Sequence, residues 1–236
     1  MNRSGCLRKK LSVGSALGTV MVLSFAACSS RPLVNAPPPL PVAAPAAFHA
    51  TISPIEGAVL ERIHWSLHPG CPVDVQHLRA VTADHVTFAG TIERGTVIVH
   101  EDAAPAIRAV LEKLFLARYP IARMEPIDAF EGDDDRSMAA NNSSGFNCRE
   151  VAGKSGVWSQ HAYGRAIDLN PVQNPYVKDG VVSPIEGRRY ADRSLGEPGV
   201  IHEGDAAVRA FDAVGWHWGG RWKHEVDYQH FSATNR

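Results

Sequence analysis

Two short segments, far apart in the chain, hold the residues that most restrict how this protein can fold. The first, SQHAYGRAIDLNP, places His161 and Asp168 seven residues apart, and the second, DYQHF, contains Asp227 and His230. Two imidazoles and one carboxylate form a nitrogen and oxygen ligand set that suits Zn²⁺ when a fourth position stays open. The sequence therefore predicts a fold in which the two segments meet around one metal ion.

The residues of the first segment predict how two of the ligands converge. Gly164 allows a tight reversal of the chain after His161. Residues 166–169 then read as a strand on which Ala166 and Asp168 face one side, while the alternate residues face the core. The small side chain of Ala166 leaves room beside an ion that His161 and Asp168 would share.

A further carboxylate and an arginine complete the predicted chemistry. Asp227 lies three residues before His230, a spacing that brings both into one cleft in a tight or short helical turn. We expect Asp227 to take a proton from the attacking water as general base and to return it to the departing amine. An arginine would hold a substrate carboxylate or stabilise the oxyanion; Arg149, nearest His161 in sequence, is the first candidate and Arg136 the second.

These motifs resemble the D-alanyl-D-alanine carboxypeptidase family of zinc peptidases, which includes vancomycin-resistance carboxypeptidases and L-alanyl-D-glutamate endolysins. The resemblance is carried by Ser159, His161, Gly164, Ala166, Asp168, Asp227, His230 and Phe231. It implies that three of these, His161, Asp168 and His230, bind one Zn²⁺ per chain. It also implies that Asp227 is the catalytic base and that Arg149 contacts substrate.

The resemblance extends over roughly residues 97–231 and implies a fold as well as an activity. The implied fold is a small α+β domain, as in the hedgehog signalling domain, with an antiparallel sheet cradling the zinc site and helices flanking it. Asp227 stands where the vancomycin-resistance branch has Glu, and the Trp218-Gly219-Gly220 step and Trp222 also resemble the endolysin type. We therefore expect the endolysin-like branch, with either a D,D-carboxypeptidase or an L-Ala-D-Glu endopeptidase activity.

The N-terminal segment predicts export. Four cations in residues 1–10 precede an apolar stretch, residues 11–25, that is shorter than the ~20 residues of a membrane span. Small residues directly before Cys28 resemble a bacterial lipoprotein signal, in which Cys28 would be lipidated. The alternative is an ordinary secretory signal cut near Ala27. We expect a membrane-anchored lipoprotein of the cell envelope, facing the periplasm or cell wall.

Composition divides the chain into a signal peptide at residues 1–28, a tether at 29–53 and a folded domain at 54–236, and the resemblance implies that this domain is a zinc peptidase. The tether is rich in Pro and Ala and nearly uncharged, which predicts a disordered spacer. The formal net charge of −1 gives no basic field for nucleic acid. We expect a monomer whose partner is the peptidoglycan stem peptide.

The cysteines outside the signal region are Cys71 and Cys148. In an oxidising compartment two such cysteines are expected to pair, so a Cys71–Cys148 disulfide is predicted. A cysteine hydrolase that uses Cys148 with His161 and Asp168 is an alternative, and it requires a free thiol. A second alternative is a non-catalytic, zinc-containing cell-wall binding module, which would have no use for a base at Asp227.

Periodicity and turn residues predict the remaining elements. A strand is expected at residues 96–100 and a helix from a cap at Asp102 to a point before Pro120. A further strand is expected at 121–130, then an acidic turn at 133–135 and a polar surface or cleft loop at 136–149. Asp205 is expected to cap a short helix that ends at Val214. His217 and His224 are interpreted as supporting or surface residues, and Ser159 as structural.

Overall fold

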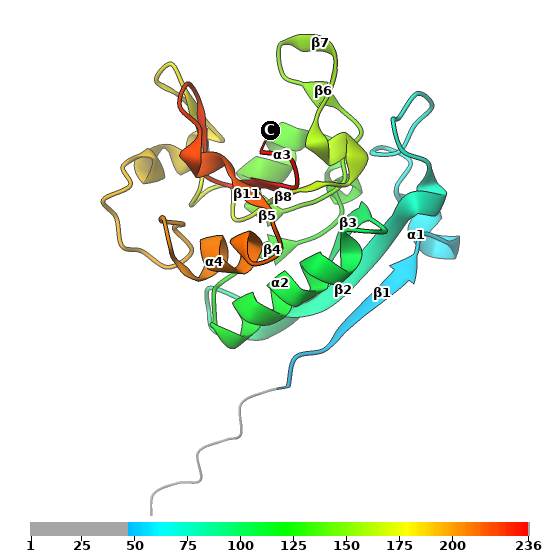
Figure 1. The fold of residues 1–236 in the computed structure, drawn as a ribbon, viewed down its shortest axis with the longest axis horizontal. Coiled ribbons are helices and arrows are strands. Elements are labelled where there is room, and N and C mark those ends of the chain that lie inside the picture. The colour runs from blue at the N-terminus through cyan, green and yellow to red at the C-terminus, as the bar shows by residue number, and fades with distance from the viewer. Residues whose placement is uncertain (1–46, 236) are drawn as a thin grey trace, which may run out of the picture. The chain divides into compact units, whose positions relative to one another are not determined.

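A three-stranded antiparallel sheet and one long helix pack together and contribute to the core (Figure 1). The computed structural model describes residues 47–235. The sheet has the order β1-β2-β3, and α2 lies across one of its faces. These elements are β1 (Ala50–Pro54), β2 (Leu78–Val86), β3 (Ile92–His100) and α2 (Ala104–Leu116).

The first described strand, β1, begins at Ala50, four residues before residue 54, where composition placed the start of the domain. β1 pairs along its whole length with β2, and the ring of Phe48 lies 5.4 Å from that of Phe115 on α2, centroid to centroid. The signal peptide, Cys28 and the tether up to residue 46 lie outside the described residues. Within residues 47–235, no helix is long and apolar enough to cross a membrane.

Helix α2 presents the apolar stripe that its sequence predicts. Ile107, Val110, Leu111 and Leu114 are all buried against the sheet. The predicted cap is wrong, however, because the residue before the helix is Ala103, which has no side chain able to cap it. The carboxylate of Asp102 instead accepts a hydrogen bond from Arg165, at 2.6 Å, and lies 2.7 Å from the ring of His100.

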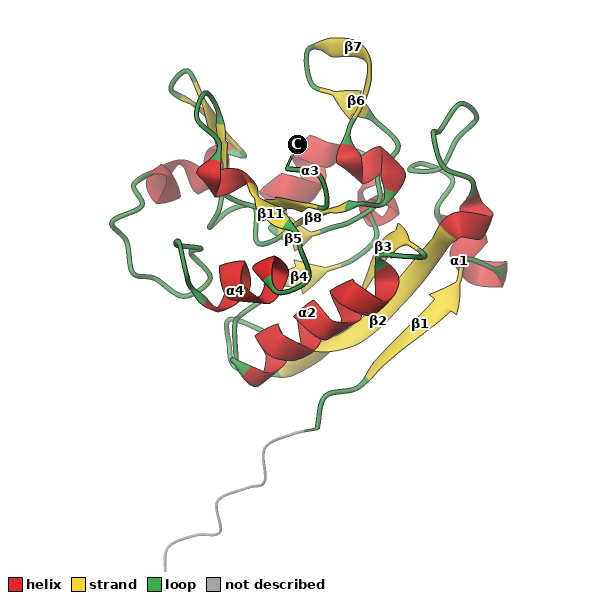
Figure 2. Cartoon of the chain, in the orientation of Figure 1, coloured by secondary structure: helices red, strands yellow, loops and turns green. Residues whose placement is uncertain are grey.

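A second antiparallel sheet, of order β11-β13-β8, lies at the centre of the molecule (Figure 2). Its strands are β8 (Ala166–Asp168), β11 (His217–Trp218) and β13 (His230–Ser232). A third antiparallel sheet joins β9 (Tyr176–Lys178), β10 (Val181–Ser183) and β12 (Val226–Asp227) in the order β10-β9-β12. The short strands of these two sheets carry most of the residues singled out by the sequence motifs.

Two strand pairs and several short helices complete the fold. Strands β4 (Arg123–Met124) and β5 (Asn142–Ser143) are parallel, whereas β6 (Glu150–Val151) and β7 (Lys154–Trp158) form a hairpin that projects at the top of Figure 1. The short α-helices are α1 (Gly57–Arg62), α3 (Asp134–Ala139) and α4 (Ala206–Asp212). The 3₁₀ helices are η1 (Val75–His77), η2 (Ile127–Phe130), η3 (Gln160–Tyr163), η4 (Ile185–Ala191) and η5 (Gly219–Arg221).

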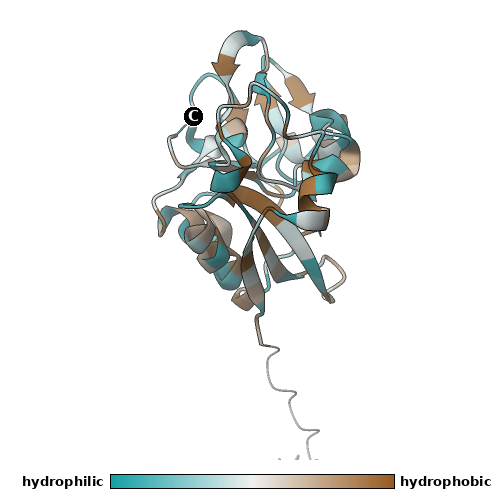
Figure 3. Cartoon of the chain, turned by 90° about the vertical axis from the view of Figure 1, so that its right-hand side faces the viewer, coloured by the Kyte–Doolittle hydropathy of each residue, from teal (hydrophilic) through white to brown (hydrophobic). Residues whose placement is uncertain are grey.

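Small antiparallel sheets and a few helices are compatible with the predicted α+β class. Figure 3, coloured by hydropathy, shows apolar stretches on the strands alternating with hydrophilic ones. The cap predicted at the start of α4 is confirmed, since the side chain of Asp205 accepts a hydrogen bond from the backbone N–H of Val208 at 3.0 Å.

Two predictions about the middle of the chain are wrong. The strand expected at residues 121–130 is limited to β4, because Pro126 has no N–H for a ladder and is followed by η2. The polar loop expected at 136–149 begins instead as α3, capped by Asp133, and continues as a buried segment. Burial of that segment is tolerated because its backbone is paired, for example Phe146 N–H to the Ile98 carbonyl at 2.7 Å.

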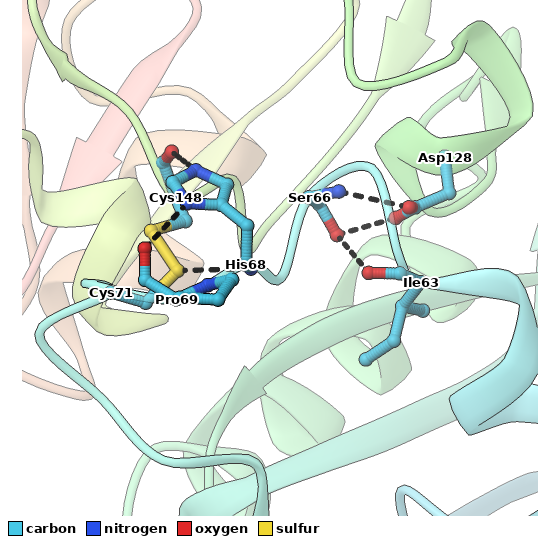
Figure 4. The surroundings of a disulfide bond; sticks show 7 residues. All are labelled: Ile63, Ser66, His68, Pro69, Cys71, Asp128 and Cys148. Atoms are coloured by element: carbon cyan, nitrogen blue, oxygen red, sulfur yellow. Dashed lines mark hydrogen bonds between the residues drawn. A yellow bond between two sulfur atoms is a disulfide. The ribbon is translucent and has the colours of Figure 1, made fainter.

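The predicted disulfide between Cys71 and Cys148 is present (Figure 4). A ring nitrogen of His68 lies 3.0 Å from the carbonyl oxygen of Cys148, and the backbone N–H of Cys148 donates to the Ser66 carbonyl at 3.1 Å. Ser66 is fixed in turn by Asp128, whose carboxylate accepts hydrogen bonds from its backbone N–H and its hydroxyl. The loop before β2 is therefore joined to the segment that leads into β6.

Candidate metal centre

The side chains of His161, Asp168 and His230 meet at one buried point. His161 Nε2 lies 3.2 Å from Asp168 Oδ2 and 3.3 Å from His230 Nδ1, and His230 Nδ1 lies 3.1 Å from Asp168 Oδ1. All three residues are buried, with 2–6 % of their surface exposed. The structure thus brings together two sequence segments that are more than sixty residues apart.

Sheet register places two of the three side chains. Asp168 on β8 lies directly opposite His230 on β13, and side chains at opposed positions of an antiparallel pair share one face of the sheet. The alternate residue of β8, Ile167, is buried in the core, as the strand periodicity predicts. The pairing of β8 with β13 therefore sets the distance between the carboxylate and the second imidazole.

A tight turn places the third side chain. Ser159 caps η3 by accepting a hydrogen bond from the backbone N–H of His161, which is a structural role. Gly164 ends η3 with a φ of 64°, in the left-handed region. A Cβ at Gly164 would lie 2.5 Å from the backbone nitrogen of His100, so only glycine fits between η3 and β3.

The imidazole of His161 is oriented from behind by a backbone group. Its Nδ1 lies 2.6 Å from the carbonyl oxygen of Gly145, so Nδ1 carries the hydrogen and donates it. The Nε2 lone pair is then directed toward Asp168 and His230. A histidine that binds a metal through one ring nitrogen usually donates the other to a carbonyl or carboxylate in this way.

The spacing of the donor atoms is close to that of a tetrahedral zinc site. Bonds of about 2.0–2.2 Å to nitrogen and oxygen place neighbouring ligand atoms roughly 3.3–3.6 Å apart in a tetrahedron. The separations observed here are 3.1–3.3 Å, and Asp168 presents one carboxylate oxygen to each histidine. The donor types, their spacing and their burial are therefore those of a candidate His/Asp/His metal site.

Burial and mutual attraction shape the charges of this cluster. Burial alone would lower the pKa of His161, but the Asp168 carboxylate and its hydrogen bond outweigh burial and raise that pKa above its ordinary value. Burial would likewise raise the pKa of Asp168, yet His161 and His230 hold it far below its usual range. Asp168 therefore stays ionised, which is the state in which a carboxylate can bind a metal ion.

Asp227 lies beside the cluster and keeps an unpartnered carboxylate oxygen. Its Oδ1 is fully buried and has no hydrogen-bond partner among the described residues. Burial, followed by the charge of Asp168, raises the pKa of Asp227 to about 7, against the opposing influence of His230, Arg149 and a hydrogen bond from Gln229. A carboxyl group of this kind exchanges a proton readily near neutral pH.

Close backbone packing positions Asp227. Strand β12 pairs with β9 so that Asp227 lies opposite Tyr176. On its other side, a Cβ added at Gly219 would lie 2.6 Å from the backbone oxygen of Asp227 and 3.3 Å from the Cβ of His230. Gly219 therefore lets the chain after β11 approach both residues more closely than any side chain would allow.

The two candidate arginines are placed differently. Arg149 lies next to η3, since its backbone oxygen accepts from the Ser159 N–H at 3.1 Å, and its charge partly opposes the rise in the pKa of both His161 and Asp227. Arg136 forms an exposed ion pair with Glu131 at 2.7 Å on the surface. The structure thus places Arg149 near the cluster and gives Arg136 a partner elsewhere.

Other residues that the sequence singled out lie outside the His/Asp/His group. His217 and His224 are exposed and lie outside the His/Asp/His group, whereas the ring of Trp222 lies 5.4 Å from that of His230. Asp133, in the predicted acidic turn, caps α3 by accepting a hydrogen bond from the backbone N–H of Arg136. Because Cys148 is in a disulfide, the cysteine-hydrolase alternative lacks its nucleophile.

Sequence reasoning did not find several groups that shape the site. They are the Gly145 carbonyl behind His161, the close approach at Gly219, the buried amide of Gln229 and the carboxylate of Asp134, which pairs with Arg149 at 2.9 Å. A backbone carbonyl or a close contact leaves no motif. The acidic run at 133–135 was a visible signal, but its composition equally suits a solvated turn.

Comparison with known families bears on this site. Residues 152–233 match the D-alanyl-D-alanine carboxypeptidase family. The match covers about a third of the 236-residue chain and includes all of His161, Asp168, Asp227 and His230, but not Arg149. No curated protein and no solved structure matches the chain. The family match supports a hydrolase of the peptidase class.

Proposed function

We propose that this protein is a zinc-dependent peptidase that hydrolyses peptidoglycan stem peptides. The observation that carries the proposal is the convergence of His161, Asp168 and His230 on one buried point beside the unpartnered carboxylate oxygen of Asp227. The matched family segment contains these four residues and supports the same class of reaction. The activity is of the D,D-carboxypeptidase or the L-Ala-D-Glu endopeptidase type.

The residues present can supply each part of such a reaction. His161 Nε2, His230 Nδ1 and an oxygen of Asp168 would hold one Zn²⁺, which supplies Lewis acidity toward a carbonyl and acidifies water. Asp227 Oδ1 takes up a proton from the attacking water and releases it to the amine that departs. Burial raises the pKa of Asp227 above its ordinary value, which suits a carboxyl group that must take up a proton and release it again.

A non-catalytic zinc module is a poorer explanation of the same residues. A structural zinc site is usually closed by four protein ligands, whereas the described group has three. A buried carboxyl group with an unpartnered oxygen costs stability, so its presence is best explained by a function. Asp227 has such a function in a hydrolase and none in a purely structural site.

We further propose that the protein is exported and held at the membrane through a lipidated Cys28, as a monomer facing the cell wall. The Cys71–Cys148 disulfide supports an oxidising compartment, because such bonds rarely persist in the cytosol. The signal sequence and Cys28 themselves lie outside the described residues. Metabolic labelling with a lipid precursor, compared between wild type and Cys28→Ala, tests the anchor.

The activity is tested by incubating the zinc-loaded protein with purified muropeptides and identifying the products by mass spectrometry. Cleavage by wild type that is lost on chelation and restored by Zn²⁺ is the expected result. Asp227→Asn is the matched variant, since it keeps the shape of the side chain and removes its proton acceptor. An absence of any cleavage while calorimetry shows one bound zinc would favour the binding-module explanation.

A further inference from the structure

Arg149, the cation beside the cluster of His161, Asp168 and His230, has its charge balanced within the protein. Its Nη2 lies 2.9 Å from Asp134 Oδ2, and both side chains are partly buried, 31 % and 26 % exposed. The other oxygen of Asp134 lies 3.4 Å from the side-chain amide of Asn147. Asp134 is therefore held between two residues of the same buried segment.

Two of the five N–H groups of the Arg149 guanidinium are directed to partners within the protein. Nη1 lies 3.5 Å from the carbonyl oxygen of Glu150, at the limit of a hydrogen bond. Nε is buried and has no partner among the described residues. The guanidinium thus keeps a buried, unpartnered N–H on a side chain whose positive charge is already matched by Asp134.

Backbone hydrogen bonds fix the segment that carries Arg149 next to the His/Asp/His cluster. The N–H of Asn147 donates to the His161 carbonyl at 3.2 Å, and the carbonyl of Arg149 accepts from the Ser159 N–H at 3.1 Å. The Cys71–Cys148 disulfide anchors the residue between them. A substrate bound at the cluster would therefore meet the Arg149 side chain in its paired state.

The pairing decides what kind of group this subsite can accept. A terminal carboxylate is bound well by a guanidinium that offers two parallel N–H groups and an unbalanced charge. Here Asp134 occupies one edge of the fork and would repel a second carboxylate, which would also have to give up its hydration. The Nη N–H groups that remain suit a neutral peptide carbonyl, whose single oxygen needs one donor and brings no charge.

We infer that the Arg149 subsite receives a neutral peptide carbonyl, so that the enzyme cuts a bond inside a peptide, and that Asp134 determines this preference. The inference rests on the proposed peptidase function and makes it more specific. Asp134 acts through Arg149 and is a specificity-determining residue. Replacing it with a neutral residue frees the guanidinium charge and opens the subsite to a terminal carboxylate.

The test uses one stem peptide in two forms, with a free C-terminal carboxylate and with a C-terminal carboxamide. The zinc-loaded full chain should cleave both forms with kcat/KM values within about threefold of each other. Asp134→Asn should raise the ratio of acid to amide about tenfold, because a charge-assisted pair with the substrate becomes available. Asp135→Asn, which removes a charge from the same turn of α3, should leave the ratio at the wild-type value.

Two outcomes would overturn the inference: a wild-type enzyme that prefers the free acid tenfold or more, or an unchanged ratio in Asp134→Asn. If Asp134→Asn fails to fold, as judged by its thermal melt, Asp134→Ser provides a second neutral variant. If neither peptide is cleaved, the proposed peptidase function fails. In that case, calorimetry gives the Kd of each peptide for wild type and for Asp134→Asn. The ratio of acid to amide affinity, judged by the same limits, then tests the preference of the Arg149 subsite.

Discussion

Substituting Gly219 with alanine should damage the site through one methyl group. The added Cβ would lie 2.6 Å from the backbone oxygen of Asp227, 3.1 Å from its Cβ and 3.3 Å from the Cβ of His230. Relief of the first contact to an ordinary separation requires a shift of roughly 0.6–0.8 Å, and backbone cannot rotate away as a flexible side chain can. The shift must be taken up by β12 or by η5, and both border the cluster.

The expected cost has two parts. Overpacking of this size destabilises a protein by about 1–3 kcal/mol, which for a chain of this length lowers Tm by roughly 2–12 °C. Misplacement of catalytic groups by up to about 1 Å costs on the order of 100-fold in rate, so kcat/KM should fall roughly 30- to 100-fold. Zinc affinity should also fall, because His230 is displaced.

The assays are thermal melts, zinc calorimetry and muropeptide turnover on wild type, Gly219→Ala and a control. Gly196→Ala is that control, since a Cβ at Gly196 meets nothing within 4 Å and its backbone is not in the left-handed region. It should match wild type in all three assays. Wild-type zinc affinity and turnover in Gly219→Ala would refute the argument that this close approach positions Asp227 and His230.

Three further predictions concern the base, the metal and pH. Asp227→Asn should bind Zn²⁺ as wild type does by calorimetry and lose about 10²- to 10⁴-fold in kcat; full turnover would show that the base lies elsewhere. Zinc at 100-fold above its Kd should stabilise the chain by about 2.7 kcal/mol, seen as a raised Tm that is absent in His161→Ala. Burial lowers the pKa of His85 below its ordinary value of 6.5, despite Glu93 and Asp84, so below pH 6.5 the unfolded chain binds a proton that the folded chain excludes. Measured by urea denaturation, the stability of wild type minus that of His85→Phe should therefore fall as the pH is lowered from 7.5 to 5.5; a difference that does not change with pH would contradict the assignment.

The parts of the site predictable from sequence are those in which side-chain chemistry itself forms the pattern. His161, Asp168 and His230 are rare donor types at distinctive spacings, and the structure brings them within 3.3 Å of one another. The apolar stripe of α2 and the capping by Asp205 were predictable for the same reason, since each follows from local residue types.

What sequence could not provide depends on contacts between distant segments. Composition at 133–135 suits a solvated turn, and only the folded chain shows that Asp134 meets Arg149. The apolar residues of 121–130 suggested a strand, but Pro126 and the packing of β4 against β3 limited that strand to two residues. The support of His161 by the Gly145 carbonyl involves a backbone atom that every residue possesses, so no residue type indicates it.

If Asp168 and His230 bind an ion as proposed, their direct opposition across β8 and β13 would make ion binding a sensitive reporter of correct folding. A slip of this pairing by one residue would turn the two ligands to opposite faces of the sheet and put Ile167 or Phe231 in their place. A misregistered chain would thus lose the cluster entirely, with no weakened intermediate form. Metal content per molecule would therefore measure the natively paired fraction in a refolded or mutant preparation.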